Sequence, residues 1–370
     1  VVLPILFAED DRLGQDAILI ETLYNLPVVT SQSASQQGKG KIVPRGVATI
    51  GEGLYDWLYD YPAGIGPVKA IGEASAGVGM LLTSPELDGV VRRLPLIIQV
   101  NNQPYPTLPL EVLRLFGGAD SYQVKVDNAG VNAVRVPNMS TVNTDANARV
   151  WINFNYTFDK LSFANDDWST LEGKIAVIAL TAEGLSNTVA TPINVSNGHE
   201  LNMQVLQMII DDNSLLRPAE AILYEVLVTA ALCLILIICA LNLYYLINAF
   251  LIITATIGIP YLGFYLFENY NLLYDYTYPV YTSFIIFSIA IFARFVHEFK
   301  AKTLIKKQFE HYLAPEIVKK LQKNPELLRL GGQTQELTIL FSDIRGFTTI
   351  SEQFKDNPLE LTKLINRYLT

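Results

Sequence analysis

The sequence predicts an α/β domain, then three membrane-spanning helices, and then a strand–turn–helix unit. Three observations support this order. Short β-branched runs alternate with stretches of helical spacing over residues 1–217. A long apolar region without charged residues comes next. Beyond it, an apolar run ends in an aspartate, a glycine and a further stretch of helical spacing.

The first of these regions has the pattern of a mixed α/β domain. Leu94–Val100 and Lys174–Leu180 are short, β-branched and bounded by turn residues, which predicts two buried strands. Leu108–Phe116 and Leu201–Ile210 have helical spacing and are expected to form helices. Ser31–Lys41 is polar and contains glycines, so we expect a loop there.

Two features of this domain suggest binding sites at first sight. The glycines between Gly64 and Gly79 are not followed by the Gly-Lys-Ser/Thr of a phosphate loop. We interpret them as turns and close backbone contacts. Arg92 and Arg93 could form an anion site. A solvated turn or a pair of structural ion pairs is the favoured interpretation.

The second region predicts membrane spans. Val226–Phe267 contains no Asp, Glu, Lys or Arg. Its length of about 42 residues corresponds to about 63 Å of helix, whereas one crossing needs only about 20 residues. Two crossings with a turn near Asn242 fit this length, and one crossing does not. A buried core hairpin of a soluble protein is the disfavoured alternative, because core helices rarely run this long without a charge. A third apolar run follows. The spans are expected within residues 219–296, at about 222–241, 244–267 and 277–296.

Charge predicts the orientation of these spans. The loop before the third run contains Glu268 and Asp275 and no basic residue. Basic flanks remain cytoplasmic, so we expect an extracytoplasmic α/β domain in a multi-pass protein of the plasma (inner) membrane. The basic residues after the third run are Arg294, Lys300, Lys302, Lys306 and Lys307. An interfacial aromatic belt is expected at Tyr261, Tyr265, Tyr270, Tyr274, Tyr276, Tyr278 and Tyr281.

Several stretches of the α/β domain, in this order, resemble the second type of CHASE domain. They are Asp88–Leu96, Trp151–Asn155, Leu161–Ala164, Leu171–Ile178, Ala182–Leu185, Thr191-Pro192 and His199–Asn202. This family consists of extracytoplasmic sensors of bacterial signalling receptors. The sequence departs from its pattern at His199, where the family usually has a His-Ala-Asn-like helix start. The resemblance implies sensing and does not identify the signal.

Residues 297–333 are expected to form a cytoplasmic helical linker. His297–Lys307 has the composition of a basic helix. Phe309–Leu321 has apolar residues at helical spacing, and Pro315 breaks or restarts the helix. Such a linker could transmit motion from the spans, and a passive amphipathic spacer is the alternative.

Residues 334–370 contain the most specific chemical motif. Leu337–Phe341 predicts a buried strand that ends near Asp343; Gly346 permits a tight turn and a helix opens at Thr348. A carboxylate suits a hard cation such as Mg²⁺. Backbone N–H groups in the turn and at the helix start can face phosphate oxygens. Further helical spacing appears at Leu361, Leu364, Ile365 and Tyr368.

The octapeptide Phe341–Thr348, Phe-Ser-Asp-Ile-Arg-Gly-Phe-Thr, closely resembles the first metal-binding motif of class III nucleotide cyclases. The catalytic domain of these enzymes has an α+β, ferredoxin-like fold. The resemblance implies that Asp343 binds both of two Mg²⁺ or Mn²⁺ ions and that the carbonyl oxygen of Ile344 binds one. It assigns phosphate binding to the backbone N–H groups of Gly346, Phe347 and Thr348.

The two resemblances together imply a sensor-regulated adenylate cyclase, a phosphorus–oxygen lyase that converts ATP to cyclic AMP and pyrophosphate. Class III active sites are shared between two catalytic domains, so a homodimer is expected. A guanylate cyclase acting on GTP is the alternative. Residues that complete such an active site lie later in these domains than Thr370. The chain by itself is therefore expected to carry only the start of the catalytic domain and to be inactive.

Other classes fit less well. A sensor with a kinase output would not need the octapeptide, and a catalytically inactive sensor fragment also remains possible. Three spans without a polar intramembrane pair give little support for transport. The net charge of −9 argues against a nucleic-acid partner. The two cysteines, Cys233 and Cys239, lie in an apolar run and predict neither a disulfide framework nor a cysteine metal site.

Overall fold

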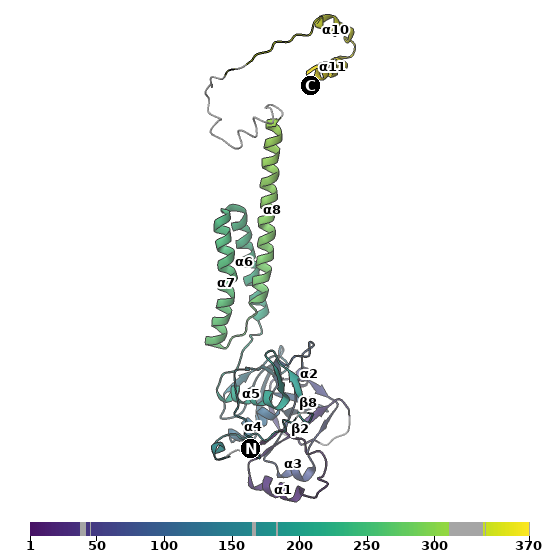
Figure 1. Ribbon diagram of the computed structural model, residues 1–370. Coiled ribbons are helices and arrows are strands. Elements are labelled where there is room, and N and C mark those ends of the chain that lie inside the picture. The colour runs from purple at the N-terminus through teal and green to yellow at the C-terminus, as the bar shows by residue number, and fades with distance from the viewer. Residues whose placement is uncertain are drawn as a thin grey trace. The chain divides into compact units, whose positions relative to one another are not determined.

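The computed structural model describes residues 1–37, 42–44, 46–164, 168–182, 184–310, 336 and 338–369. The chain divides into two compact units, Val1–Val296 and His297–Thr370. The first unit contains an α/β domain and most of a three-helix bundle (Figure 1). The expected order of an α/β domain followed by long helices is therefore confirmed.

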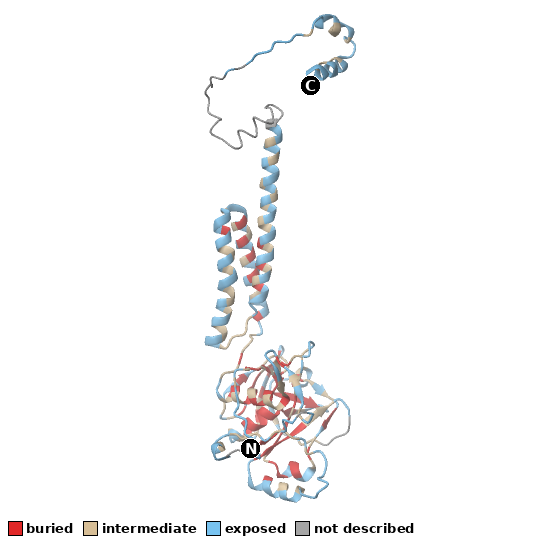
Figure 2. Ribbon diagram, viewed as in Figure 1, coloured by how far each residue is buried: buried red, intermediate tan, exposed pale blue. Residues whose placement is uncertain are grey.

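The α/β domain consists of short strands and helices around one main hydrophobic core, and most of the buried residues lie in this domain (Figure 2). Its elements are β1 (Val2–Leu3), α1 (Asp16–Asn25), β2 (Val29–Ser35), β3 (Val47–Ile50), α2 (Leu54–Trp57), β4 (Asp60–Tyr61), β5 (Ala63–Ile65), α3 (Lys69–Ala74), β6 (Gly77–Met80), β7 (Arg93–Pro95), β8 (Ile97–Val100), β9 (Gln103–Pro106), α4 (Leu108–Phe116), β10 (Tyr122–Asp127), β11 (Gly130–Arg135), β12 (Thr141–Asn143), β13 (Arg149–Trp151), the 3₁₀ helix η1 (Trp168–Leu171), β14 (Thr188–Ala190), β15 (Val195–Asn197) and α5 (Gly198–Ile210).

The strands form several small sheets rather than one large sheet. β2 pairs in parallel with β1 and β6 and antiparallel with β5. A second sheet has the order β12-β11-β10-β3, and a third has the order β4-β8-β9. β7 pairs with β13, and β14 pairs with β15, both antiparallel. The β7–β13 pair lies next to the segment that leads to the membrane helices, through a bridge between Trp151 and Leu215.

The prediction of a loop at Ser31–Lys41 is wrong in its first half, because Ser31 to Ser35 belong to β2. Ser31 and Gln32 are buried. Ser31 Oγ donates to the Ile5 carbonyl at 2.8 Å. The Gln32 amide binds both the N–H and the carbonyl of Val43, at 2.8 and 3.2 Å. Internal hydrogen bonds therefore let a polar sequence form a buried strand. Residues 38–41 lie outside the described part of the chain.

The two expected strands had different outcomes. Leu94–Val100 is buried, but it is divided between β7 and β8. The division falls at Leu96, whose N–H donates to the Ala148 carbonyl at 2.8 Å. Lys174–Leu180 is not a buried strand, since only Val177 forms an isolated bridge, with Val2 of β1. β1 is two residues long and offers no further partner for this segment.

The two expected helices are confirmed. α4 covers Leu108–Phe116, and α5 begins at Gly198, three residues before the expected Leu201. β6 approaches α4 so closely that a Cβ atom at Gly79 would lie 2.6 Å from Leu108 Cα. This contact confirms that glycine serves close backbone packing here.

The expected spans also appear as helices. They are α6 (Ala221–Asn242), α7 (Tyr245–Tyr270) and α8 (Thr277–Glu310). Among the described residues, these three helices are long and apolar enough to cross a membrane. The turn after Asn242 lies where the sequence predicts it. α8 continues past the expected end of the third span and includes the basic stretch His297–Lys307 as helix.

The three helices have little internal core of their own. Leu236, Ala240 and Phe287 form the buried cluster of the bundle. Most other residues of these helices are exposed or only partly buried (Figure 2), as expected where lipid replaces protein as the surrounding medium. Arg294 fastens α8 to the end of α6, because its Nη1 donates to the Ala240 carbonyl at 2.8 Å. Its guanidinium also lies 4.6 Å from the centre of the Tyr245 ring.

In the second unit, α10 (Phe347–Gln353) and α11 (Pro358–Leu369) are helices. The prediction of a buried strand at Leu337–Phe341 is wrong over residues 338–341, which have no regular secondary structure and no strand partner in the described chain. Ile339, Leu340 and Phe341 are 71%, 88% and 92% exposed. An apolar strand needs neighbouring strands to be buried, and residues 338–369 contain none. The linker helix expected at Phe309–Leu321 lies almost wholly outside the described residues.

Candidate functional site

The expected turn forms between Phe341 and α10. Gly346 adopts a left-handed conformation, with φ of 76°, at the N-terminus of the helix. A residue with a Cβ atom would be strained at this position. The N–H of Phe347 donates to the Ile344 carbonyl at 3.3 Å and closes the turn. The helix begins at Phe347, one residue before the expected Thr348.

Asp343 precedes this turn and is exposed. One of its carboxylate oxygens accepts the N–H of Ile344 at 2.8 Å. The carboxylate and the Ile344 carbonyl are both hard oxygen ligands, so their chemistry fits Mg²⁺ or Mn²⁺. These two ligands alone are too few for a complete metal site. The described residues contain no group of three or more His, Cys, Asp or Glu that could hold a metal ion.

The N–H groups expected to face phosphate fall into two classes. The Phe347 N–H is used inside the turn. Those of Gly346 and Thr348 lie at the start of α10, where the first N–H groups of a helix lack intrahelical partners. The positive end of the helix dipole adds to their attraction for an anion. Phosphate binding by the N–H groups of Gly346, Phe347 and Thr348 stays a prediction.

The groove between α10 and α11 has a different character. It encloses about 320 Å³ and is lined mainly by apolar side chains. The helical spacing noted in the sequence places Leu361, Leu364 and Ile365 in this lining. The groove adjoins the turn through Ile344 and Phe347, but its mainly apolar lining adds no further metal ligand. Its lining residues are Ile344, Phe347, Ile350, Leu361, Leu364, Ile365, Arg367 and Tyr368.

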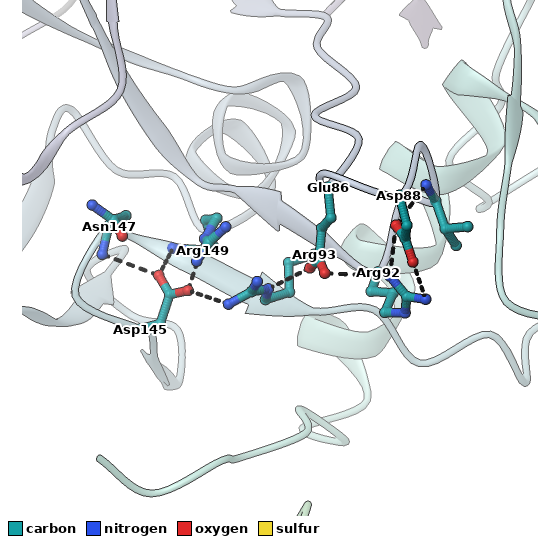
Figure 3. Close-up of polar contacts among 8 residues, drawn as sticks. Glu86, Asp88, Arg92, Arg93, Asp145, Asn147 and Arg149 are labelled. Carbon is teal, nitrogen blue, oxygen red and sulfur yellow. Dashed lines mark hydrogen bonds and ion pairs between the residues drawn. The ribbon is translucent and has the colours of Figure 1, made fainter. Parts of the chain in front are cut away.

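The two arginines in the α/β domain lie in a chain of ion pairs (Figure 3). Arg92 binds Asp88 through two hydrogen bonds, at 2.7 and 3.1 Å, and also contacts Glu86 at 3.3 Å. The hydrogen bond from Arg92 is the main cause that lowers the pKa of Asp88 to about 2. Arg93 Nε donates to the other oxygen of Glu86 at 2.7 Å.

Asp145 completes this chain. It lies 3.2 Å from Arg93 and 2.7 Å from Arg149. Arg93 also stacks on Trp151, and Arg149 faces the ring of Tyr59. Three guanidinium groups thus alternate with three carboxylates across β7, β13 and the preceding turns, and their charges cancel. The arrangement confirms that Arg92 and Arg93 form structural ion pairs and not an anion site.

Sequence reasoning missed two charged residues next to the membrane helices. Arg217 Nη2 donates to Glu225 at 3.0 Å, and its Nη1 donates to the Leu273 carbonyl at 3.2 Å. Glu225 also accepts the N–H of Asp275 at 2.7 Å. Glu225 is the last acidic residue before the uncharged stretch, and an acid at the start of a span usually has a partner. The position of Glu225 could therefore have indicated in the sequence that this residue has a charged partner.

The Arg217–Glu225 ion pair includes one residue of a span, whereas the sequence predicted no polar pair within the spans. Glu225 lies in the second turn of α6, but Arg217 precedes the helix. The pair therefore ties the end of the bundle where α6 begins and does not line a path through it. It gives no support for transport.

Residues 1–242 match the CHASE2 domain. The chain belongs to the CHASE2 domain family. No curated protein and no solved structure matches the chain. The CHASE2 match continues past residue 217 to the end of α6, so it includes the first apolar helix as well as the α/β domain. With its three apolar helices, the protein is a membrane-associated CHASE2 sensor module.

Proposed function

We propose that this CHASE2 module is the sensor part of a membrane-bound class III nucleotide cyclase that converts ATP to cyclic AMP and pyrophosphate. The observation that carries the proposal is the octapeptide Phe341–Thr348, which forms a tight turn into a helix. Asp343 precedes the turn and Gly346 makes it possible. The position of this motif, after three apolar helices in the sequence, supports a receptor-type enzyme.

In the proposed reaction, the ribose 3′-hydroxyl attacks the α-phosphate and pyrophosphate leaves. Asp343 would hold the divalent ions together with the Ile344 carbonyl. Two Mg²⁺ or Mn²⁺ ions, when bound, activate the hydroxyl and offset the charge on the leaving group. The N–H groups of Gly346 and Thr348 would orient the phosphates. These groups contact metal or phosphate only, so GTP remains the alternative substrate.

The proposal includes a location and an assembly. The basic residues along α8 support a cytoplasmic end for that helix and an extracytoplasmic CHASE2 domain in the plasma membrane. A homodimer is proposed because class III active sites are shared between two catalytic domains. The signal that the CHASE2 domain detects is not part of the proposal.

The test starts with the coding sequence beyond Thr370. It should encode a second metal-binding aspartate on a strand, followed by the remainder of a cyclase domain. Membranes that contain the protein encoded by the whole gene should form cyclic AMP or cyclic GMP with Mg²⁺ or Mn²⁺. Asp343→Ala should reduce the rate by at least about a hundredfold, since metal charge stabilisation contributes several kcal/mol.

The matched control is Asp356→Ala, which removes another carboxylate from the same unit, after α10 and away from the turn. It should keep near-normal activity. A gene that ends without these elements would exclude the cyclase. Near-normal turnover by the Asp343→Ala protein would show that this carboxylate does not bind the metals.

A further inference from the structure

We infer that motion of the CHASE2 domain reaches the third membrane helix directly, through a contact beside the start of α6 and the end of α7 that does not run along either of these helices. The contact, here named the juxtamembrane joint, consists of Leu215–Arg217, Glu225 and Leu272–Asp275. The inference rests on the sensor role of the CHASE2 family and does not require a cyclase output.

The backbone part of the joint is strand-like. Leu215 bridges Trp151 of β13 on one side. Leu216 bridges Leu272, in the loop between α7 and α8, on the other. Two backbone hydrogen bonds of 2.9 Å close the second bridge, from Leu216 N–H to Asn271 and from Leu273 N–H to Leu216. The last strand of the β7–β13 pair is thereby connected to the loop that begins the third span.

The side-chain part of the joint is a satisfied ion pair. The Arg217 and Glu225 side chains are 25% and 10% exposed. The guanidinium binds both the carboxylate and the Leu273 carbonyl. The carboxylate binds the Asp275 N–H. Removing either charge would leave a largely buried partner unsatisfied, so the joint resists opening.

Asp275 links the joint to the first turn of α8. Its Oδ1 accepts the backbone N–H of Thr277, the first residue of that helix, at 2.8 Å. α8 then runs without interruption for 34 residues, which corresponds to about 51 Å of helix. A rotation or shift at the joint is therefore applied to one end of a continuous helix whose other end is Glu310.

The covalent route is longer and less firmly packed. From Arg217 to Leu273 the chain passes through all of α6 and α7, a separation of 56 residues. The most apolar part of α7 buries none of its residues against the rest of the described protein. The hydrogen-bonded contact couples the CHASE2 domain to the loop before α8 without passing through α6, α7 and the turn between them.

The experiment measures amide hydrogen exchange of the whole chain in lipid nanodiscs. Exchange at Leu273 and Asp275 reports opening of the joint. Arg217→Ala should raise both rates about tenfold or more, because it removes charge-assisted hydrogen bonds from a partly buried pair. Glu225→Gln should raise the rate at Asp275. Arg217→Lys keeps the charge but loses the planar guanidinium that donates to both Glu225 and Leu273, so it should give an intermediate rate. This variant keeps the test valid if the alanine variant misfolds.

Coupling between β13 and the loop before α8 is measured with a second substitution, in the CHASE2 domain. Val150→Ala loosens the buried side of β13 and should raise exchange at Leu273 and Asp275 severalfold when the joint is intact. In an Arg217→Ala background, this added effect should fall below about twofold. Arg135→Ala in β11 and Glu220→Gln before α6 change exposed charges that take no part in the hydrogen bonds of the joint, and should leave these rates unchanged.

Two results would overturn the inference. One is wild-type exchange at Leu273 and Asp275 in both Arg217 variants, which would show that the joint does not hold the loop. The other is a Val150→Ala effect of undiminished size in the Arg217→Ala background, which would show that coupling runs along α6 instead. Neither result depends on any enzymatic activity, so a failed cyclase proposal would leave the inference intact.

Discussion

At the scale of single residues, Asp145 shows how a short sheet can be stabilised by charge. Its carboxylate accepts hydrogen bonds from Arg93 and Arg149, and from the backbone N–H groups of Asn147 and Arg149. These bonds hold β7 and β13 together beside the segment that leads to the membrane. The side chain is 23% exposed, so water screens part of each interaction.

Asp145→Ala should therefore reduce the free energy of unfolding of the CHASE2 domain by about 2–3 kcal/mol, since two arginines lose a partly buried partner. Unfolding can be followed by tryptophan fluorescence, because Trp57, Trp151 and Trp168 all lie in this domain. Asp120→Ala, which removes an exposed carboxylate of the same domain, should change stability by less than about 0.5 kcal/mol. Equal effects of the two variants would contradict the structural role given to Asp145.

His199 gives a prediction for pH. Burial in the first turn of α5 lowers the pKa of His199 below its ordinary value of 6.5. The unfolded chain then binds a proton more readily than the folded chain. Above pH 6.5 the residue is neutral in both states and does not affect stability. As pH falls below 6.5 and through the lower pKa of the folded state, the CHASE2 domain should lose stability.

His199→Gln should flatten this part of a plot of unfolding free energy against pH. His297→Gln, an exposed histidine outside the domain, serves as the control and should leave the plot unchanged. The measurement is denaturant unfolding by tryptophan fluorescence between pH 7.5 and pH 5. A His199→Gln protein with the same slope as the parent would rule out this histidine as the source.

At the scale of elements, the contact between β6 and α4 depends on the absence of a side chain. A Cβ atom at Gly79 would lie 2.6 Å from Leu108 Cα, and backbone cannot move aside as a flexible side chain can. Gly79→Ala should reduce the free energy of unfolding by about 1–3 kcal/mol through overpacking. Gly46→Ala, where a Cβ atom would meet nothing within 4 Å, should be close to neutral. Chemical denaturation measures the free energy of unfolding of both variants. An unchanged value for Gly79→Ala would show that α4 can shift without cost.

At the scale of the whole molecule, the arrangement in the membrane can be measured. The charge pattern places the loop between α7 and α8 outside and the end of α8 inside. With Cys233 and Cys239 replaced by alanine, a cysteine at Glu268, in the last turn of α7 before this loop, should react with an impermeant thiol reagent in intact cells. A cysteine at Lys307 should react only after the membrane is opened. Labelling of position 307 from outside would contradict the predicted orientation and the cytoplasmic location of the turn at Asp343.

The sequence by itself determined the features that depend on local patterns. The three long helices follow from uninterrupted apolar composition, and their boundaries lie within a few residues of the expected ones up to α8. α4 and α5 follow from helical spacing. The CHASE2 resemblance was visible as ordered short stretches, and the family match confirms it. Composition, periodicity and motif order are local properties, so a single sequence suffices to show them.

Only the tertiary structure decided which polar residues become partners. The polar strand at Ser31 and Gln32 was mistaken for a loop, because its hydrogen bonds go to Ile5 and Val43, which are distant in sequence. The strand expected at Leu337–Phe341 had the right composition but lacks neighbouring strands in the described residues. The joint between Arg217 and Leu273 connects positions 56 residues apart. Burial and pairing are settled by such long-range contacts, which a local pattern in the sequence does not contain.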